Sequence, residues 1–368
     1  MSVLAGGVFA TGAATDEETQ LRELVDDLGA QSVDARRGHR GIPETFDDVL
    51  WRNLEQTGLT RLTSTSDLGA GPTESAIVLR GLARHSGAVP VAETDILAAW
   101  LGAQAGIDLP EVGPLTVAIA DAFTGVNQDR VSGTARDVPW TRAADAVLLA
   151  VPAPTGLLVR RVSDGDITIT DGHNLAGEPR DVVAFDLPAT SFDILDASVA
   201  DELTRRGAWA RCVQTIGALD AAAELSVAHT RDRVQFGRAL SKFQAVQHAL
   251  AGMAGEIERA RATTTLAVAA TADHGFASAQ ADYAVTIAKV TLGRVVPSVA
   301  TVAHQLHGAI GVTIEHQLWS STTRALSWIG EFGSTGRYSR RLGSVALNTA
   351  RGGNLWDALI GFDQTGWA

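Results

Sequence analysis

The sequence predicts a mainly α-helical protein with a central β domain, and three successive patterns along its 368 residues predict this order. Apolar residues at helical spacing fill roughly residues 1–112. Short β-branched runs, broken by Gly, Pro, Asp and Asn, fill residues 113–197 and favour a compact antiparallel β domain. Long runs rich in Ala, Val and Leu fill residues 198–368, and small-residue helices of this kind are typical of a tight antiparallel bundle.

Four segments of the first domain have the spacing or the end signals of helices. Residues 16–29 place acidic residues in the first turn and apolar residues on one face. A second helix is expected after Pro43, because proline is favoured at a helix start. Residues 71–87 predict a third helix, and residues 91–106 predict a fourth that ends at a glycine.

The rest of the chain divides into strand-like and helical runs. The strand-like runs are 115–123, 145–153, 156–162, 166–172 and 181–187, and the long helical runs are 201–228, 243–272 and 277–306. Helices of this length with so few interruptions are expected to pack against other subunits as well as against one another.

Composition excludes several classes of protein. A formal net charge of −12 and a pI near 5.2 argue against nucleic acid as a partner. The single cysteine, Cys212, cannot form an intramolecular disulfide, which fits a cytoplasmic protein, and its apolar surroundings predict a small buried side chain. The N-terminus has no basic region typical of a signal peptide, and no apolar run is judged long enough to span a membrane.

A basic cluster stands out against this acidic background. In "TRDRVQFGRALSKFQAVQH", residues 230–248, Arg231, Arg233, Arg238 and Lys242 surround Phe236-Gly237 where one long helix ends and the next begins. Helix N-termini and arginines both stabilise phosphates, and the Phe-Gly pair is suited to clamping a flat ligand. The alternative is a set of solvated charges at a helix junction.

A second segment, "HQLHGAIGVT" at 304–313, follows a long helical run. Gly308 and Gly311 permit close approach of backbone to a ligand, with Gln305 and His307 beside them. The alternative for the glycines is a helix C-cap, and His307 either bonds a ligand or satisfies a helix end. The histidines do not have the spacing of a metal site, so no metal is expected.

Taken in order, Arg233-x-x-Phe236-Gly237, Phe243-Gln244 and Gln305–Gly311 resemble the motifs of the acyl-CoA dehydrogenase family. The resemblance implies a helical domain, an antiparallel β-barrel or sandwich and a C-terminal four-helix bundle. It also implies FAD bound at a subunit interface, with Arg233 at the pyrophosphate. The implied cofactor-binding residues are Arg233, Phe236, Gly237, Gln244, Gln305, His307, Gly308 and Gly311.

The family chemistry implied is α,β-dehydrogenation of an acyl-CoA thioester, in which a carboxylate removes the α-proton. Glu331, in "LSWIGEFGSTGRYSRR", is the carboxylate near the position where many members keep this base. Its alternative is a surface or capping acid beside Arg337, Arg340 and Arg341. Other members keep the base on the first long bundle helix, and the matching position here is Gly207.

The motifs of the flavin ring are weaker than those of the dinucleotide. The acidic-Gly-Ser-Asp loop usual in the family is replaced by "ADAFTGVNQDR", residues 120–130, and Trp140 stands where a residue pair usually lines the flavin. The chain therefore resembles the partner type of heteromeric members, which contribute the clamp to another subunit's site. A homotetramer using Glu331 and a catalytically silent structural or regulatory subunit stay open, as do the acyl chain and the electron acceptor.

Overall fold

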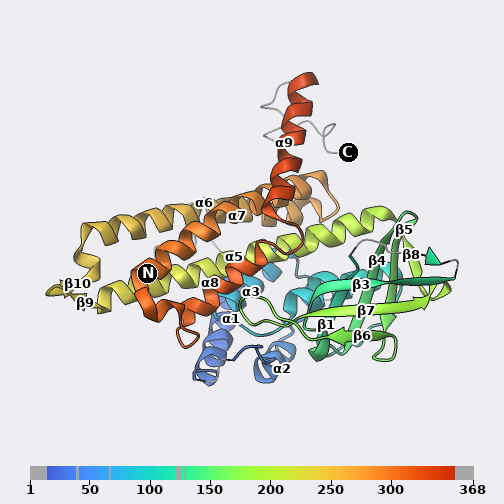
Figure 1. The fold of residues 1–368 in the computed structure, drawn as a ribbon, viewed down its shortest axis with the longest axis horizontal. Coiled ribbons are helices and arrows are strands. Elements are labelled where there is room, and N and C mark those ends of the chain that lie inside the picture. The colour runs from blue at the N-terminus through green and yellow to red at the C-terminus, as the bar shows by residue number, and fades with distance from the viewer. Residues whose placement is uncertain (1–14, 39–40, 66–67, 122–125, 128, 353–368) are drawn as a thin grey trace. The chain divides into compact units, whose positions relative to one another are not determined.

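The structure is a computed structural model that describes residues 15–38, 41–65, 68–121, 126–127 and 129–352, and Figure 1 shows its fold. Packing divides the chain into two compact units, each described here by itself. The sheet unit comprises residues 27–75 and 87–207, and the bundle unit comprises residues 1–26, 76–86 and 208–368. Three helices, α1 (Asp16–Ala35), α3 (Pro72–Arg84) and α5 (Ala197–Asp232), have residues in both units.

The second helix begins later than predicted, at Asp48 and not directly after Pro43, because the capping side chain is that of Asp47. Helix α2 (Asp48–Gln56) starts after Asp47, whose Oδ1 accepts from the Leu50 N–H at 2.9 Å. The π-helix η2 (Ala92–Ala99) continues into α4 (Trp100–Ala105), which ends at the left-handed Gly106. The buried Asp95 carboxylate on η2 accepts from the backbone N–H groups of Thr63 and Ser64, so it ties this helix to the preceding loop.

The strands form two four-stranded sheets that enclose one apolar core. The first sheet has the order β1-β4-β5-β8 and the second β2-β3-β7-β6. Their bounds are β1 (Leu115–Ile119), β2 (Val126–Asn127), β3 (Arg130–Pro139), β4 (Ala146–Ala153), β5 (Gly156–Val162), β6 (Ile167–Thr170), β7 (Arg180–Pro188) and β8 (Asp193–Leu195). Leu149 and Val151 of the first sheet share the core with Val183 and Phe185 of the second, so the packing is that of a sandwich.

One strand pairing differs from the antiparallel prediction. β1 pairs with β4 in parallel, with Leu115 beside Ala146 and Ile119 beside Ala150. All other pairings among the described strands are antiparallel. A parallel pair needs a long connection, and here β2 and β3 of the other sheet lie between the two strands in sequence, so local patterns did not reveal it.

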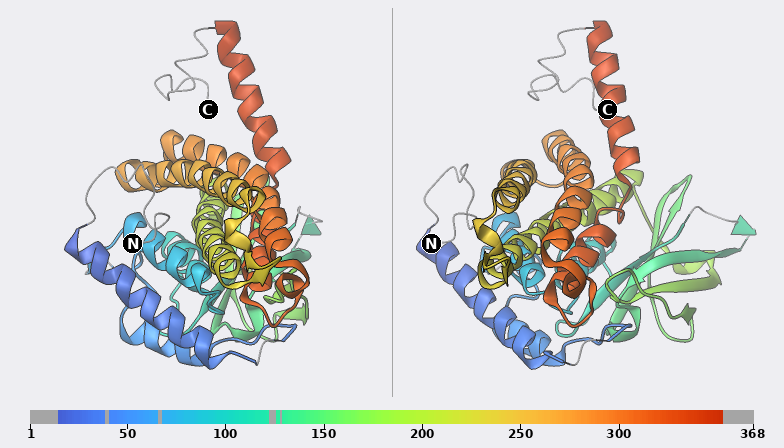
Figure 2. Two further views of the ribbon diagram at one scale, coloured as in Figure 1. Left: turned by 90° about the vertical axis from the view of Figure 1, so that its left-hand side faces the viewer. Right: turned by 60° about the vertical axis from the view of Figure 1, so that its left-hand side comes forward.

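The bundle unit is built from helices, most of which lie side by side. They are the second part of α5, α6 (Gln244–His274), α7 (Ala279–His307), α8 (Gln317–Trp328) and α9 (Thr335–Gly352). Only residues 275–278 join α6 to α7, and the Ser278 hydroxyl caps α7 by accepting from Ala281 N–H at 3.1 Å. Figure 2 shows α6 and α7 packed together and α9 projecting from the bundle. Small residues allow the close packing, because a Cβ at Gly217 of α5 would lie 2.1 Å from the Arg80 carbonyl oxygen of α3.

Residues 279–312 are long and apolar enough to cross a membrane by length and composition alone. Of the most apolar window in that stretch, 56% is buried inside the structure, as expected of a core helix. The sequence prediction that no apolar run reaches this length is therefore wrong for α7, and the absence of a membrane span stays a prediction.

The predicted fold class is confirmed: helices come first, β-sheets follow and a helical bundle ends the described chain. Strands β1 to β8 lie between Leu115 and Leu195, and α5 begins at Ala197. The domain boundaries 1–112, 113–197 and 198–368 stay predictions, and their outer ends at 1–14 and 353–368 lie outside the described residues.

Candidate functional site

The Phe236-Gly237 pair forms a strained two-residue turn. It joins β9 (Val234–Gln235) to β10 (Arg238–Ala239), which pair in antiparallel fashion. The backbone φ is +54° at Phe236 and +78° at Gly237, the two positive values of a type I′ turn. Glycine adopts this conformation freely, but a phenylalanine loses about 1–2 kcal/mol there. The residue is nevertheless 88% exposed, with an edge-to-face contact to the Phe243 ring at 6.2 Å, so burial does not offset the strain, which favours contact with a ligand or partner.

The basic residues around this turn are exposed. Arg231, Arg233, Arg238 and Lys242 form no ion pair within the described part of the chain, although Asp232 lies among them. The Arg238 guanidinium lies 4.2 Å from the centre of the Phe243 ring, a cation–π contact. The Arg233 N–H donates to His229 O at 2.9 Å, and Leu240 N–H donates to Arg233 O at 2.9 Å. The backbone of Arg233 is therefore fixed, while its side chain is available to an anion.

Gln244 is the first residue of α6 and is exposed. Its preceding residue, Phe243, provides no side-chain cap, and the first turn of α6 has no acidic residue. The N-terminus of this 31-residue helix thus presents its uncapped N–H groups beside the basic cluster. Gln244 is thus at the N-terminus of α6, and its contact with a cofactor stays a prediction.

The segment Gln305–Gly311 is the end of α7 and the 3₁₀ turn η6 (Gly308–Val312). Gly308 has φ +66° and ψ −148°, a conformation open essentially to glycine alone, and its N–H donates to His304 O. A Cβ at the buried Gly311 would lie 2.7 Å from the His307 Cβ. Local structure therefore explains why both positions are glycine, and Gly308 serves as the helix cap. Gln305, in contrast, is exposed.

His307 joins this segment to the end of α5. Its ring stacks on His229 with centroids 4.5 Å apart and meets His316 edge-on at 5.0 Å. The side chain is 6% exposed, Nδ1 donates to Ala303 O at 2.8 Å, and Nε2 is buried without a hydrogen-bond partner in the described chain. Burial lowers the pKa of His307, and the nearby Ala303 and Leu225 carbonyls oppose that shift.

The structure therefore brings together the two sets of motif residues that are far apart in the sequence. His229 lies one helical turn before Arg233, and His307 lies inside Gln305–Gly311, so the ring contact unites both motifs at one end of the bundle. Figure 1 shows β9, β10 and the end of α7 at this same end. Among the described residues no group of three or more His, Cys, Asp or Glu side chains is arranged to hold a metal.

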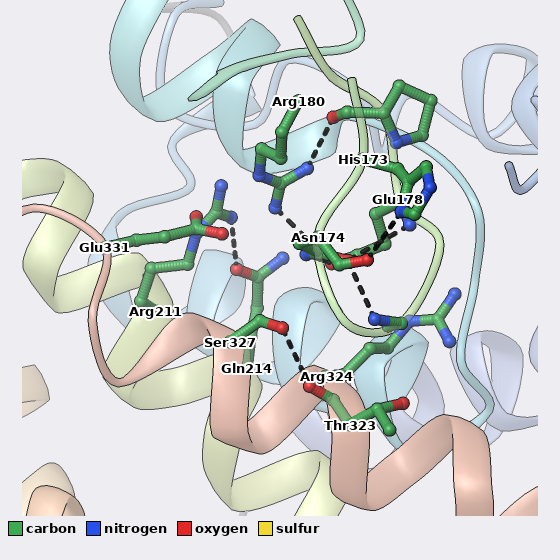
Figure 3. Close-up of polar contacts among 12 residues, drawn as sticks. His173, Asn174, Glu178, Arg180, Arg211, Gln214, Thr323, Arg324, Ser327 and Glu331 are labelled. Carbon is green, nitrogen blue, oxygen red and sulfur yellow. Dashed lines mark hydrogen bonds and ion pairs between the residues drawn. The ribbon is translucent and has the colours of Figure 1, made fainter. Parts of the chain in front are cut away.

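Glu331 lies away from this cluster, in the turn between α8 and α9. Its Oε2 accepts from Arg211 Nε at 2.6 Å, and Arg211 Nη1 donates to Gln214 at 2.6 Å, as Figure 3 shows. Arg211 lies on α5 and precedes Arg233, the residue directly after that helix, by 22 positions, or roughly 33 Å along a helix axis at 1.5 Å per residue. Glu331 thus forms an ion pair with Arg211 of α5, and its predicted alternative as an acid beside Arg337, Arg340 and Arg341 stays a prediction.

Two residues of this region were not identified from the sequence. Arg211 is 3% exposed in its side chain and lies in the otherwise apolar run "AWARCVQTIGAL", and a charge in such a run was the available signal. Lys289 is also buried, and its Nζ donates to Glu331 O at 2.7 Å and to Ile329 O at 2.9 Å. Cys212 is buried as predicted, and burial raises the pKa of its thiol to about 12.

Two other expectations concern the flavin ring. Trp140 is 3% exposed and packs near Phe46 at a centroid distance of 6.1 Å, which is the arrangement of a buried core tryptophan. The loop that departs from the family pattern, residues 120–130, includes residues 122–125 and 128, which lie outside the described residues.

Comparisons with known proteins agree with the motifs. Residues 197–331 match the family model described as acyl-CoA dehydrogenase, C-terminal domain. The chain is 28% identical over 312 residues to acyl-CoA dehydrogenase IpdE2 of Mycobacterium tuberculosis, with 82% of this chain and 89% of that protein covered. It is 27% identical over 336 residues to acyl-CoA dehydrogenase FadE27 of the same organism, with the same coverage of both proteins.

Solved structures show that the fold is shared. A chain of the ChsE4–ChsE5 complex from Mycobacterium tuberculosis superposes with a TM-score of 0.79 at 24% identity, covering 93% of this chain and 99% of that one. Butyryl-CoA dehydrogenase from Megasphaera elsdenii superposes with a TM-score of 0.77 at 20% identity, covering 91% and 99%.

Proposed function

We propose, from the premise that this chain is a member of the acyl-CoA dehydrogenase family, that it clamps FAD in an assembly that dehydrogenates an acyl-CoA thioester. In this role it is the partner subunit of a heteromer with a homologous chain, located in the cytoplasm. The observation that carries the proposal is the strained, exposed Phe236-Gly237 turn inside a cluster of arginines without ion-pair partners among the described residues.

The residues at this end of the bundle fit a dinucleotide. The Arg233 side chain is exposed on a fixed backbone, which suits a charge-assisted hydrogen bond to the pyrophosphate. Phe236 would lie along the adenosine portion with Gln244 at the N-terminus of α6. FAD supplies the redox chemistry when it is bound, and the protein supplies its position.

The second segment supports the same ligand. Gln305 is exposed at the end of α7, and the exposed Gly308, where a Cβ would meet nothing within 4 Å, lets a ligand approach the backbone there. The buried His307 ring stacks on His229, one helical turn before Arg233, so His307 would orient the cofactor-binding residues by joining the end of α7 to the end of α5.

Distance favours an assembly of at least two subunits. Arg211, the ion-pair partner of Glu331, lies roughly 33 Å from Arg233 along the axis of α5. This distance is longer than that between the pyrophosphate and the reactive ring of FAD. A flavin held by this clamp would therefore present its ring to a carboxylate of another subunit. The similar ChsE4–ChsE5 structure is a complex of two named chains, which supports a heteromer here.

The alternative hypothesis is that the chain is itself catalytic and uses Glu331 as its base. Each subunit of a homotetramer would then remove the α-proton with its own Glu331 and bind the flavin of a neighbour. The Arg211 guanidinium, 2.6 Å from the carboxylate, favours the partner version, because an arginine at this distance stabilises the charged form and weakens the base. A silent structural or regulatory subunit is the second candidate, and the same ion pair favours it.

Native mass spectrometry with flavin counting tests the proposal. The chain is produced alone and together with each homologous chain of its organism, and FAD per assembly is measured by absorbance after denaturation. We expect little flavin with the chain alone and FAD in a hetero-oligomer that oxidises an acyl-CoA. A homo-oligomer saturated with FAD and active by itself would reject the partner version, and a flavin-free hetero-oligomer would favour the structural subunit.

A further inference from the structure

The turn between α8 and α9 is held at several of its backbone groups by residues of α7, α8 and α9. The Lys289 ammonium of α7 binds two of its carbonyls, Ile329 O at 2.9 Å and Glu331 O at 2.7 Å. The Tyr338 hydroxyl of α9 donates to Phe332 O at 2.9 Å. The Glu331 N–H donates to Trp328 O at 3.2 Å. This turn is therefore fixed at both the backbone and the side chain of Glu331.

The contact with the Glu331 side chain comes from α5. Arg211 Nε binds Oε2 at 2.6 Å, and the side chains are 3% and 16% exposed. Gln214 accepts from the other arm of the same guanidinium, as Figure 3 shows. The Arg211 guanidinium also lies 5.7 Å from the centre of the Phe332 ring. Arg211 is thus oriented by two partners, and water screens the ion pair weakly because the arginine is buried.

The backbone of the turn is also unusual at two positions. Phe332 has φ +54° and Gly333 has φ +114°. A Cβ at Gly333 would lie 2.8 Å from Tyr338 Cε2, so the turn packs directly on that ring. A segment that keeps positive φ at a phenylalanine needs contacts that hold it, and Lys289 and Tyr338 supply them.

Such an arrangement conflicts with removal of a substrate proton. A general base must be able to approach the carbon acid and to accept its proton, whereas Glu331 is bound to a cation at its side chain and at its own carbonyl. Protonating Glu331 would leave the buried Arg211 without this charge partner.

We propose that Arg211 and Lys289 are positioning residues that hold Glu331 as a structural carboxylate of the α8–α9 turn, and that this pairing prevents Glu331 from acting as the base. The inference rests on the proposed function, in which another subunit removes the α-proton. On this inference, Arg211 and Lys289 are one reason why this subunit does not supply the catalytic base, in addition to any loss of motif residues.

A double-mutant cycle tests the structural half and needs no cofactor. The variants are Glu331→Gln, Arg211→Gln and both together, with Glu315→Gln as an exposed control of the same chemistry. We expect Glu331→Gln to lower the thermal midpoint by about 5 °C or more, because it leaves the arginine unpaired, and the control to change it little. The double variant should be no less stable than the worse single variant, and additive losses would overturn the pairing.

Kinetics of the flavin-loaded assembly test the other half, with flavin content counted first in each variant. We expect Glu331→Gln to retain turnover within about threefold and to keep the pH profile of kcat, since another carboxylate is the base. A loss on the order of 10²-fold or more at unchanged flavin content and midpoint would overturn the inference. That result would not contradict the proposed binding of FAD by this chain. A wild-type assembly without flavin, in contrast, would reject the proposed function but not the pairing of Arg211 with Glu331.

Discussion

Asp220 of α5 and Arg261 of α6 form a buried ion pair in the bundle unit, with Oδ1 and Nη2 2.6 Å apart. The two side chains are 6% and 5% exposed, and Arg80 of α3 adds a second contact from Nε to Oδ2 at 2.8 Å. One carboxylate therefore connects three helices. Removal of the Asp220 carboxylate would leave Arg80 and Arg261 without this charge, so we expect the substitution to lower the stability of the fold.

We predict that Asp220→Asn lowers the free energy of unfolding by about 3 kcal/mol, the low end for a broken buried pair, because the buried Arg261 keeps only its ion pair with Glu258. Urea denaturation followed by circular dichroism measures the change. The control is Glu18→Gln, which breaks the i,i+4 pair with the half-exposed Arg22 on α1 and should cost at most about 0.5 kcal/mol. Equal effects of the two variants would contradict the role of the buried pair.

We predict that Gly217→Ala destabilises the chain by roughly 1–3 kcal/mol, since its Cβ would meet the Arg80 carbonyl oxygen at 2.1 Å and α3 would have to shift. The matched variant is Gly252→Ala on α6, where a Cβ meets nothing within 4 Å. Alanine should stabilise that helix by about 0.5–1 kcal/mol. Thermal unfolding of the isolated chain compares the two, and opposite signs are the expected result.

We predict that Arg233→Ala weakens the retention of FAD by about 1.5–3 kcal/mol, the range for hydrogen bonds to charged groups. Equilibrium dialysis of the assembly measures this loss. Arg52→Ala on α2 is the control, because it removes an exposed arginine outside the clamp. Unchanged flavin affinity in Arg233→Ala would exclude a contact with the pyrophosphate.

We predict that Phe236→Asn separates stability from cofactor binding. Asparagine tolerates the positive φ of this position, so the thermal midpoint should stay constant or rise, with a gain of at most about 1–2 kcal/mol. Flavin retention should fall, because the exposed ring is lost. If the midpoint fell while flavin content stayed the same, the ring would be a structural element of the hairpin.

We predict that the free energy of unfolding decreases as the pH falls from about 7 towards 5. Burial lowers the pKa of His229, His304 and His307 below the usual 6.5. The unfolded chain therefore binds more protons in this range, and stability is lost as the pH drops through 6.5 towards the folded values. His307→Gln should flatten this dependence, while His248→Gln, at an exposed position of α6, should not. Urea titrations at several pH values give the slopes.

Much of the architecture follows from local patterns. The start of α1 at Asp16, the end of α4 at Gly106 and the end of α7 before Gly308 agree with the helix signals of the sequence. The sequence did not predict the π-helical geometry of η2 or the parallel pairing of β1 with β4. Both depend on contacts with distant segments, such as Asp95 with Thr63, which a window of neighbouring residues does not contain.

The sequence by itself determined the order of helices, sheets and bundle and the residue types of the clamp, because these depend on short-range periodicity and on motifs of a few residues. Only the tertiary structure decided that His229 meets His307 and that Arg211 and Lys289 hold Glu331. The reason is physical: whether a carboxylate is a free base or half of an ion pair depends on the charge next to it in space, and that charge lies 120 positions away in the chain.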